Sequence, residues 1–155
     1  MSKSQIQQGA QRVIRDYHVA IRNGDQAGLW NTLSQKKRDQ KIEEDRTGEE
    51  SLDNFYNSQF EFGAQLTTPE YASAKVLSVD RRTGAVEIYV GNLGYDGSCS
   101  SSYPPSDRWS GITWVRRENG KWGYEPGYST TEQRRDRWEN ANDSYKLLGF
   151  GCNPL

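Results

Sequence analysis

The sequence predicts an α+β domain in which three N-terminal helices pack on an antiparallel sheet and a C-terminal helical segment follows. Apolar residues recur at helical spacing from Ile6 to Phe60, and they alternate every second residue in the part that follows Pro69. The chain has 155 residues, which is close to the usual size of one domain. We therefore expect a single domain whose helices and strands occupy separate parts of the chain.

The first helix is predicted from one apolar face, which is the strongest periodic signal in the chain. Gly24 can adopt the left-handed conformation that ends a helix, and Asp25 can accept from the free N–H groups that begin the next one. The sequence therefore predicts a sharp corner between two helices. The residues of the apolar face are Ile6, Ala10, Val13, Ile14, Tyr17, Ala20 and Ile21.

The second helix is short, and a charged segment separates it from the third. Residues 35–46 have Ile42 as their only apolar residue, and we interpret them as a solvated helix end or a mobile connection. Thr47 and Glu50 then match a capping box, which predicts the start of the third helix. The apolar positions are Leu29, Trp30 and Leu33 in the second helix and Leu52, Phe55, Tyr56 and Phe60 in the third.

Two hairpins are predicted from alternating residues around turn signals. The first joins strands at 71–80 and 85–93, and residues 94–107, rich in Gly, Ser and Pro, form a long loop after it. The second is built on Asn119-Gly120, the preferred pair for a type I′ turn. Its register pairs Glu118 with Lys121, Arg117 with Trp122 and Val115 with Tyr124. One face, expected to be buried, carries Thr113, Val115, Trp122 and Tyr124 with Arg117 at its rim, and the other carries Ile112, Trp114, Arg116, Lys121 and Glu125.

The polar segment from Thr130 to Tyr145 predicts a C-terminal helix that lies across a surface of the domain. A local basic patch beside Trp138 is of the kind that binds nucleic acid. Interleaved acidic residues cancel its charge, so we favour a solvated helix with ion pairs such as Arg135–Glu139. The basic residues are Arg134, Arg135 and Arg137, and the acidic ones are Glu132, Asp136, Glu139 and Asp143.

Charge and composition exclude several classes of partner. The formal net charge is -1, from 20 basic and 21 acidic residues, so no overall field attracts nucleic acid or an anionic membrane. No stretch approaches the roughly 18 apolar residues of a membrane span, and the N-terminal residues are too polar for a secretory signal. With one His and two Cys, the usual nitrogen and sulfur ligands of zinc are lacking. We expect neither a metal nor a cofactor.

The two cysteines bear on the compartment of the protein. Cys99 and Cys152 both lie in loose, Gly-containing sequence rather than in an apolar run. We favour a disulfide between them, which would close a loop of about 50 residues and imply an oxidising compartment. Met1-Ser2-Lys3 would then be an expression start on an exported or membrane-anchored domain. The alternative is two free thiols in a cytosolic protein.

The order of the predicted elements resembles the NTF2-like superfamily, the cone-shaped fold of nuclear transport factor 2, ketosteroid isomerase and SnoaL-like polyketide cyclases. The residues that carry the resemblance are Tyr17 to Leu33 (YHVAIRNGDQAGLWNTL) and Gly111 to Tyr124 (GITWVRRENGKWGY). It implies that residues 1–126 form a cone, in which a curved sheet wraps around the helices and leaves a pocket at its open end. Residues 127–155 would be a helical extension packed on this domain.

The resemblance implies no particular activity, and no residue stands out as catalytic. Enzymes of the superfamily use a carboxylate or a His–Asp pair beside an oxyanion donor. His18 is a candidate base, with a partly exposed helix residue as the favoured interpretation. Glu87 is the one acidic residue in a strand-like run near the apolar faces, but alternation turns it away from them, which favours a solvated position. Asp96 and Asp107 bracket the long loop, where turn formation explains them equally well.

Several aromatic residues are candidates for a ligand pocket or for the core. Trp114 differs from them because the predicted register places it on the polar face, where a large ring marks contact with another element or subunit. A homodimer through the sheet is one form of such a contact, and burial under the C-terminal helix is the alternative. The pocket-lining candidates are Tyr17, Trp30, Phe55, Trp122 and Tyr124.

Three functions are consistent with this sequence. The first is a non-catalytic NTF2-like module for protein interaction or ligand sensing, in a bacterial cell-envelope or exported protein, because the cone lacks an evident acid–base pair. The second is a small cone-pocket enzyme, an isomerase, cyclase or hydratase acting on an apolar substrate, with Tyr17, Glu87 or an aspartate as its acid–base group. The third is a scaffold whose C-terminal helix docks on a partner protein. A carboxylate that points into a real cavity beside a tyrosine would favour the enzyme.

Overall fold

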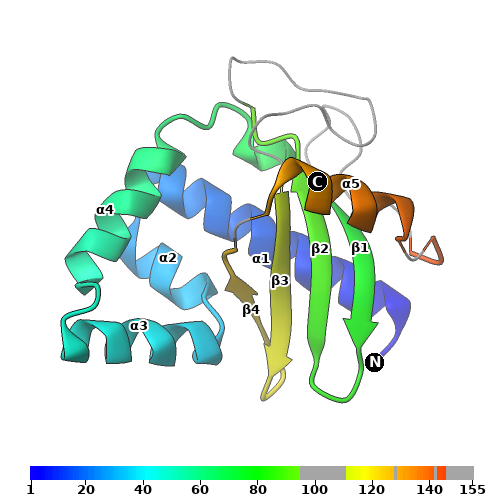
Figure 1. Ribbon diagram of the computed structural model, residues 1–155, viewed down its shortest axis with the longest axis horizontal. Helices are drawn as coiled ribbons and strands as arrows, with labels where there is room; N and C mark the ends of the chain where they lie inside the picture. Colours follow the sequence, from blue (N-terminus) through cyan, green and yellow to red (C-terminus); the bar gives the residue numbers. More distant parts are fainter. Residues whose placement is uncertain (95–110, 128, 142, 146–155) are drawn as a thin grey trace.

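The computed structural model describes residues 1–94, 111–127, 129–141 and 143–145, and in them helices precede an antiparallel sheet (Figure 1). The predicted α+β class is confirmed. The elements in chain order are α1 (Lys3–Asn23), α2 (Gln26–Thr32), α3 (Gln35–Thr47), α4 (Leu52–Gly63), the 3-10 turn η1 (Pro69–Tyr71), β1 (Ser73–Asp80), β2 (Ala85–Gly91), β3 (Gly111–Glu118), β4 (Lys121–Glu125) and α5 (Thr131–Glu139).

The four strands form one open sheet in the order β1-β2-β3-β4, and all neighbouring pairs are antiparallel. Both predicted hairpins are present. In the second, Asn119 and Gly120 have φ values of 51° and 78°, as a type I′ turn requires. The predicted register between β3 and β4 is confirmed at all three residue pairs. On the face that was expected to be buried, Thr113, Val115 and Tyr124 are indeed buried.

The predicted corner between the first two helices is also confirmed. Gly24 ends α1 with a φ of 66°, and the Asp25 carboxylate accepts from the backbone N–H of Gly28 at 2.9 Å. The apolar face of α1 is buried along its whole length against the sheet and the other helices. Helix α1 thus contributes more buried apolar residues to the helical layer than α2, which buries Leu29, or α4, which buries Phe55 and Tyr56.

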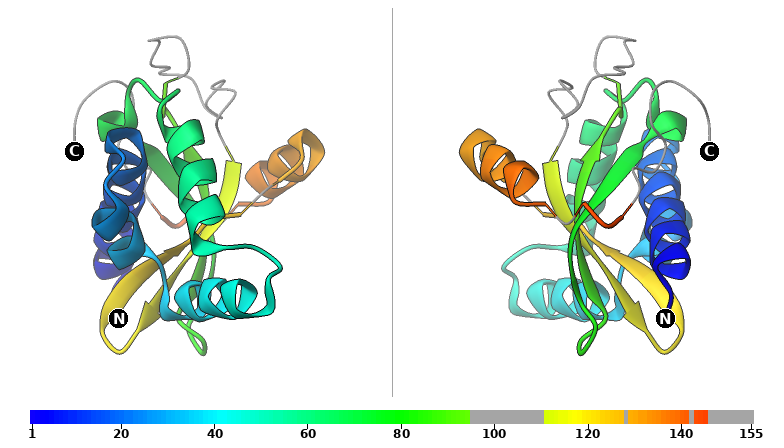
Figure 2. Two further views of the ribbon diagram at one scale, coloured as in Figure 1. Left: turned by 90° about the vertical axis from the view of Figure 1, so that its left-hand side faces the viewer. Right: turned by 90° about the vertical axis from the view of Figure 1, so that its right-hand side faces the viewer.

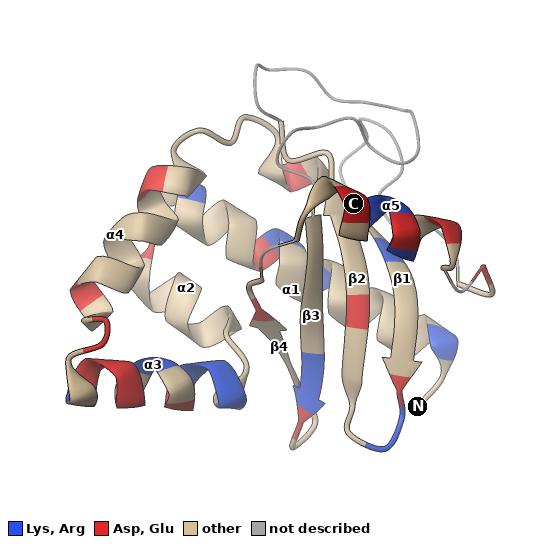
Figure 3. Cartoon of the chain, in the orientation of Figure 1, with Lys and Arg blue, Asp and Glu red and all other residues tan. Residues whose placement is uncertain are grey.

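The interpretation of residues 35–46 as a solvated helix end or mobile connection is wrong, because they form α3. Ser34 caps its start by accepting from the backbone N–H of Lys37 at 3.1 Å, and Gly48 ends it. The helix buries no residue completely, and Figure 3 shows both signs of charge along it. It therefore depends on its caps and on side-chain pairs one turn apart. These pairs are Gln35–Asp39, Gln40–Glu44, Lys41–Glu44 and Arg46–Glu43.

The predicted capping box at Thr47 and Glu50 is also wrong, since Thr47 is the last residue of α3. The next helix, α4, begins at Leu52, and Ser51 caps it by accepting from the backbone N–H of Asn54 at 3.1 Å. Glu50 instead accepts from Lys41 Nζ at 3.0 Å. Four helices therefore precede the sheet, where three were predicted.

Two helical layers lie on opposite faces of the sheet, with α1 on one side and α5 on the other (Figure 2). Helix α5 ends at Glu139, earlier than the predicted helix. It is not simply solvated, because Arg137 forms an ion pair with Glu87 of β2 and the Trp138 ring packs edge-on to Tyr89 at 5.2 Å. Glu87 is accordingly buried, so the expectation that it is solvated is wrong.

A close backbone contact joins the start of α3 to β4. The Ser34 N–H donates to the carbonyl oxygen of Tyr124 at 3.0 Å, and the Ser34 hydroxyl donates to Glu125 Oε1 at 3.0 Å. A Cβ atom on the neighbouring Gly123 would overlap the Cα of Ser34. The absence of a side chain at Gly123 therefore lets α3 lie against the sheet.

Some predictions fall outside the described residues. These concern the disulfide between Cys99 and Cys152, the loop beyond Gly94 and the aspartates Asp96 and Asp107. None of the helices in the described part of the chain combines the length and apolar character that crossing a membrane requires.

The Ser34 contact can be tested with two Gly→Ala substitutions in strands. Gly123→Ala should lower the free energy of unfolding by about 1–3 kcal/mol, because the added methyl group overlaps Ser34. Gly111→Ala is the control, since the nearest atom to its Cβ would be Ser129 Oγ at 3.6 Å, and it should leave stability within about 1 kcal/mol of wild type. Urea unfolding followed by circular dichroism measures both, and equal effects would contradict the contact.

Candidate functional site

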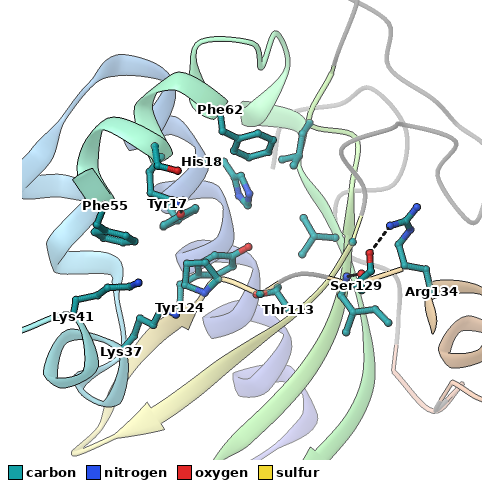
Figure 4. A pocket seen from close by; sticks show the side chains of 18 of the residues that line it. Tyr17, His18, Lys37, Lys41, Phe55, Phe62, Thr113, Tyr124, Ser129 and Arg134 are labelled. Carbon is teal, nitrogen blue, oxygen red and sulfur yellow. Dashed lines mark hydrogen bonds between the residues drawn. The ribbon is translucent and has the colours of Figure 1, made fainter. Parts of the chain in front are cut away.

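A cavity of about 610 Å³ lies between α1, α3, α4 and the sheet. Figure 4 shows side chains from the helices and from the strands pointing into it. Its volume is within the range of about 300–1,000 Å³ that is usual for small-molecule sites. Of the predicted pocket residues, Tyr17, Phe55 and Tyr124 line this cavity, and further apolar wall comes from Phe62, Val90 and Leu93.

The other two pocket candidates do not line it. Trp30 packs edge-on to Tyr56 of α4, with ring centroids 6.3 Å apart, as part of the helical layer. Trp122 lies against Gly9 of α1 and borders a smaller cleft of about 230 Å³ between α3 and β4. The sequence predicted an inward-facing ring at both positions, but which rings border open space depends on how the helices pack.

Two stacked phenols form the inner wall of the cavity. The rings of Tyr17 and Tyr124 are 4.3 Å apart and nearly parallel, and Tyr17 donates its hydroxyl hydrogen bond to Gln59 of α4. Burial raises the pKa of Tyr17 well above its usual value, and the proximity of Tyr124 raises it further. Burial also raises the pKa of Tyr124 to about 12, although a hydrogen bond with Thr113 opposes the shift. Both phenols are therefore protonated donors at neutral pH.

His18 lies beside these phenols and is buried, so the expectation of a partly exposed residue is wrong. Its ring is edge-on to Tyr17 at 5.1 Å and to Tyr124 at 5.5 Å. Nδ1 is 2.8 Å from the carbonyl oxygen of Ile14, which can only accept, so Nδ1 carries the proton. Burial lowers the pKa of His18 to about 4, and the hydrogen bond to Ile14 only partly offsets this. The ring is neutral, and Nε2 has a free lone pair with no hydrogen-bond partner among the described residues.

Cationic side chains border the opposite side of the cavity. Lys41 Nζ lies 3.0 Å from Glu44 and 3.0 Å from Glu50, and 4.8 Å from the centre of the Phe55 ring. Lys37 is one helical turn earlier on α3. Figure 4 shows both lysine side chains extending from α3 toward Tyr124. The cavity is thus aromatic at its inner wall and positively charged along α3.

A third cation comes from the opposite side of the sheet. Arg134 of α5 borders the cavity and donates to the carbonyl oxygen of Ser129 at 3.0 Å and to the hydroxyl of Thr131 at 3.1 Å. Ser129 in turn accepts from the backbone N–H of Ile112 at 3.1 Å, which ties this segment to β3. The chain that leads to α5 therefore completes the cavity wall.

No sequence signal singled out Lys37, Lys41 or Arg134 as site residues. The four-residue spacing of the two lysines would place them on one helical face, but only if the segment is known to be a helix. Arg134 was considered only as part of a basic patch. Its position at the cavity depends on the contacts of Ser129 with Ile112 and Arg134, for which the sequence carries no signal.

The acid–base pair that would indicate an enzyme is not formed by carboxylates. Among the described residues that line the cavity, Glu50 is the one acidic residue, and it is bound to Lys41. Glu87 lies on the opposite face of the sheet, paired with Arg137. In the described ranges, no group of three or more His, Cys, Asp or Glu residues could hold a metal ion.

Trp114 lies outside this site, on the face of the sheet that carries Glu87. It is 38% exposed, so α5 does not bury it, and its role in an interface stays a prediction.

Comparison of the chain with protein-family models, with curated proteins and with solved structures found no match.

The neutrality of His18 predicts a pH dependence of stability. The unfolded ring has the ordinary pKa of 6.5 and the folded ring a pKa of about 4, so below pH 6.5 only the unfolded state gains a proton. The neutral His18 ring therefore makes its full contribution to the free energy of unfolding above pH 6.5, and this contribution is lost as the pH falls toward 4. Between pH 7 and 5, the free energy of unfolding should fall by about 2 kcal/mol more in wild type than in His18→Asn. Urea unfolding at each pH measures the difference, and identical slopes would contradict it.

Proposed function

We propose that this chain is an NTF2-like module that binds a small, flat, largely apolar ligand in the cavity and does not transform it. The observation that carries the proposal is a cavity with an aromatic inner wall whose phenols are protonated, in which the one carboxylate among the described lining residues, Glu50, is bound to Lys41 and is not free to act as a base. Such a site can hold and orient a ligand through ring contacts and hydrogen bonds.

The arrangement of layers supports the NTF2-like part of the proposal. Helices α1, α2 and α4 precede an antiparallel sheet, and the cavity lies between the helices and the strand ends. A cone of this kind presents its pocket at one end, and here the described residues place α3 beside it. A role in the cell envelope or outside the cell would depend on the pairing of Cys99 and Cys152, and it remains a prediction.

Binding can be tested with the neutral fluorophore N-phenyl-1-naphthylamine, which is flat and apolar. Wild-type protein should increase its fluorescence with saturation at one probe per chain. Ser58→Trp should reduce the affinity at least about tenfold, because Ser58 borders the cavity and an indole there would fill it. Asn57→Trp is the matched control, since Asn57 is an exposed neighbour on α4 that does not line the cavity. No saturable binding, or equal loss in both variants, would overturn the proposal.

His18 favours a second candidate function, the cone-pocket enzyme. Its unprotonated Nε2 lies in the same cavity as the phenol of Tyr124, whereas the hydroxyl of Tyr17 already donates to Gln59. A base beside a phenol donor is the combination needed to remove a proton next to a carbonyl and stabilise the oxyanion. The pKa of about 4 makes His18 a weak base, because burial disfavours the imidazolium that proton transfer would create. We therefore place ligand binding first.

A base in this position should act on a flat, activated carbon acid. With 5-nitrobenzisoxazole as the probe, the second candidate function requires wild-type protein to accelerate ring opening about tenfold or more over His18→Asn. The rate should be constant between pH 6 and 8, because a group with a pKa of about 4 is already unprotonated there. Ring-opening is followed by absorbance of the phenolate product, and equal rates for the two proteins would exclude His18 as the base.

A further inference from the structure

We propose that the ligand of the cavity is an organic anion, whose flat apolar body lies against the aromatic wall and whose carboxylate or sulfonate group binds Lys37 of α3. This inference rests on the proposed function and names the chemical class of the ligand. It follows from the distribution of charge around the cavity and from the contacts of each charged residue.

The residues that line the cavity carry an excess of positive charge. Among those described, Lys37, Lys41 and Arg134 are cationic, and Glu50 is the one carboxylate. The other polar groups of the inner wall are uncharged, because both phenols are protonated and His18 is neutral. The chain as a whole has a formal net charge of -1, so this excess is a local property of the cavity.

Lys37 differs from the other two cations in its contacts. Lys41 is bound by two carboxylates, and Arg134 donates to a backbone carbonyl and a hydroxyl. The ammonium group of Lys37 has neither a hydrogen bond nor an ion pair with any described residue. The residue is half-buried, and this burial lowers the pKa of Lys37, as does repulsion from Lys41, while attraction to the carboxylates of Glu44, Glu125 and Glu50 offsets the shift only in part. A partly desolvated cation without a counterion is costly, and an anionic ligand would remove that cost.

The nearby carboxylates cannot easily turn toward Lys37, because each is already bound. Glu125 accepts from Arg116 Nε at 2.7 Å and from the Ser34 hydroxyl at 3.0 Å. Glu44 and Glu50 both accept from Lys41 Nζ. Moving any of them to Lys37 would break an existing ion pair, so within the described chain the counterion position beside Lys37 is left to a ligand.

The geometry also places the two lysines at one end of the cavity and an apolar ring at another, while Arg134 borders it from the side of α5. Lys37 and Lys41 extend from α3, and Phe62 lies on the far side, with Tyr17, His18 and Tyr124 between them (Figure 4). Lys37 is held in place because Ser34, which accepts from its backbone N–H, is itself bonded to β4. A ligand with an anionic group at one end and a ring system at the other matches this arrangement.

The test compares two probes that share one ring system. 1-Anilinonaphthalene-8-sulfonate carries a sulfonate, and N-phenyl-1-naphthylamine is the same molecule without it. Wild-type protein should bind the anionic probe at least about tenfold more tightly than the neutral one. Lys37→Gln should weaken binding of the anionic probe about tenfold and leave the affinity for the neutral probe within about twofold. Lys36→Gln, an exposed neighbour that does not line the cavity, should change neither.

The outcomes separate this inference from the function on which it rests. The proposed function fails if no probe binds saturably, or if the binding that is seen is not blocked by Ser58→Trp. The anion assignment then fails with it. If both probes bind in the cavity with the same affinity, or Lys37→Gln and Lys36→Gln have equal effects, only the anion assignment is overturned. Lys37→Met keeps the aliphatic chain and removes the charge, so it should weaken binding of the anionic probe as Lys37→Gln does. If its thermal unfolding matches wild type, altered folding is excluded as the cause of the weaker binding.

Discussion

Ser34 donates its backbone N–H to the carbonyl oxygen of Tyr124, and this hydrogen bond of 3.0 Å holds the start of α3 against β4. Helix α3 buries no residue completely, so it has no apolar face that would fix its position. Its location depends instead on this junction, on the cap that Ser34 provides and on the missing side chain at Gly123. The position of Lys37 and Lys41 at the cavity therefore depends on this close approach of α3, whose one apolar residue is the exposed Ile42, to β4.

Burial determines the protonation state of the groups inside the cavity. The same loss of solvent raises the pKa of Tyr17 and Tyr124 and lowers the pKa of His18, because removing water disfavours every charged form. Lys37 borders this region, and its ammonium group has no hydrogen bond or ion pair with a described residue. A single physical cause thus produces hydrogen-bond donors at the inner wall, a neutral base beside them and a place for an anion at α3.

The two faces of the sheet have different chemistry. One face forms the core and the cavity wall, and the other holds Glu87 in an ion pair with Arg137 and Tyr89 against Trp138. These contacts attach α5 to the outer face, and the segment before α5 brings Arg134 to the cavity. The outer face therefore contributes to the site indirectly, through the chain segment that passes from β4 to α5, while Trp114 stays exposed on it.

The sequence alone determined those elements of the fold whose formation depends on interactions between residues close together in the chain. The apolar stripe of α1, the Gly24-Asp25 corner and the register at Asn119-Gly120 were all predictable, because helical periodicity and turn geometry need only neighbouring residues. Helix α3 was not predicted, since caps and charged pairs leave no apolar period. Tertiary structure alone decided the burial of His18 and the pairing of Glu87 with Arg137, which is 50 positions away. It also decided that Lys37 lines the same cavity as the phenols of Tyr17 and Tyr124. Each of these requires elements distant in the chain to exclude water from the same place, and no local pattern of residues encodes that.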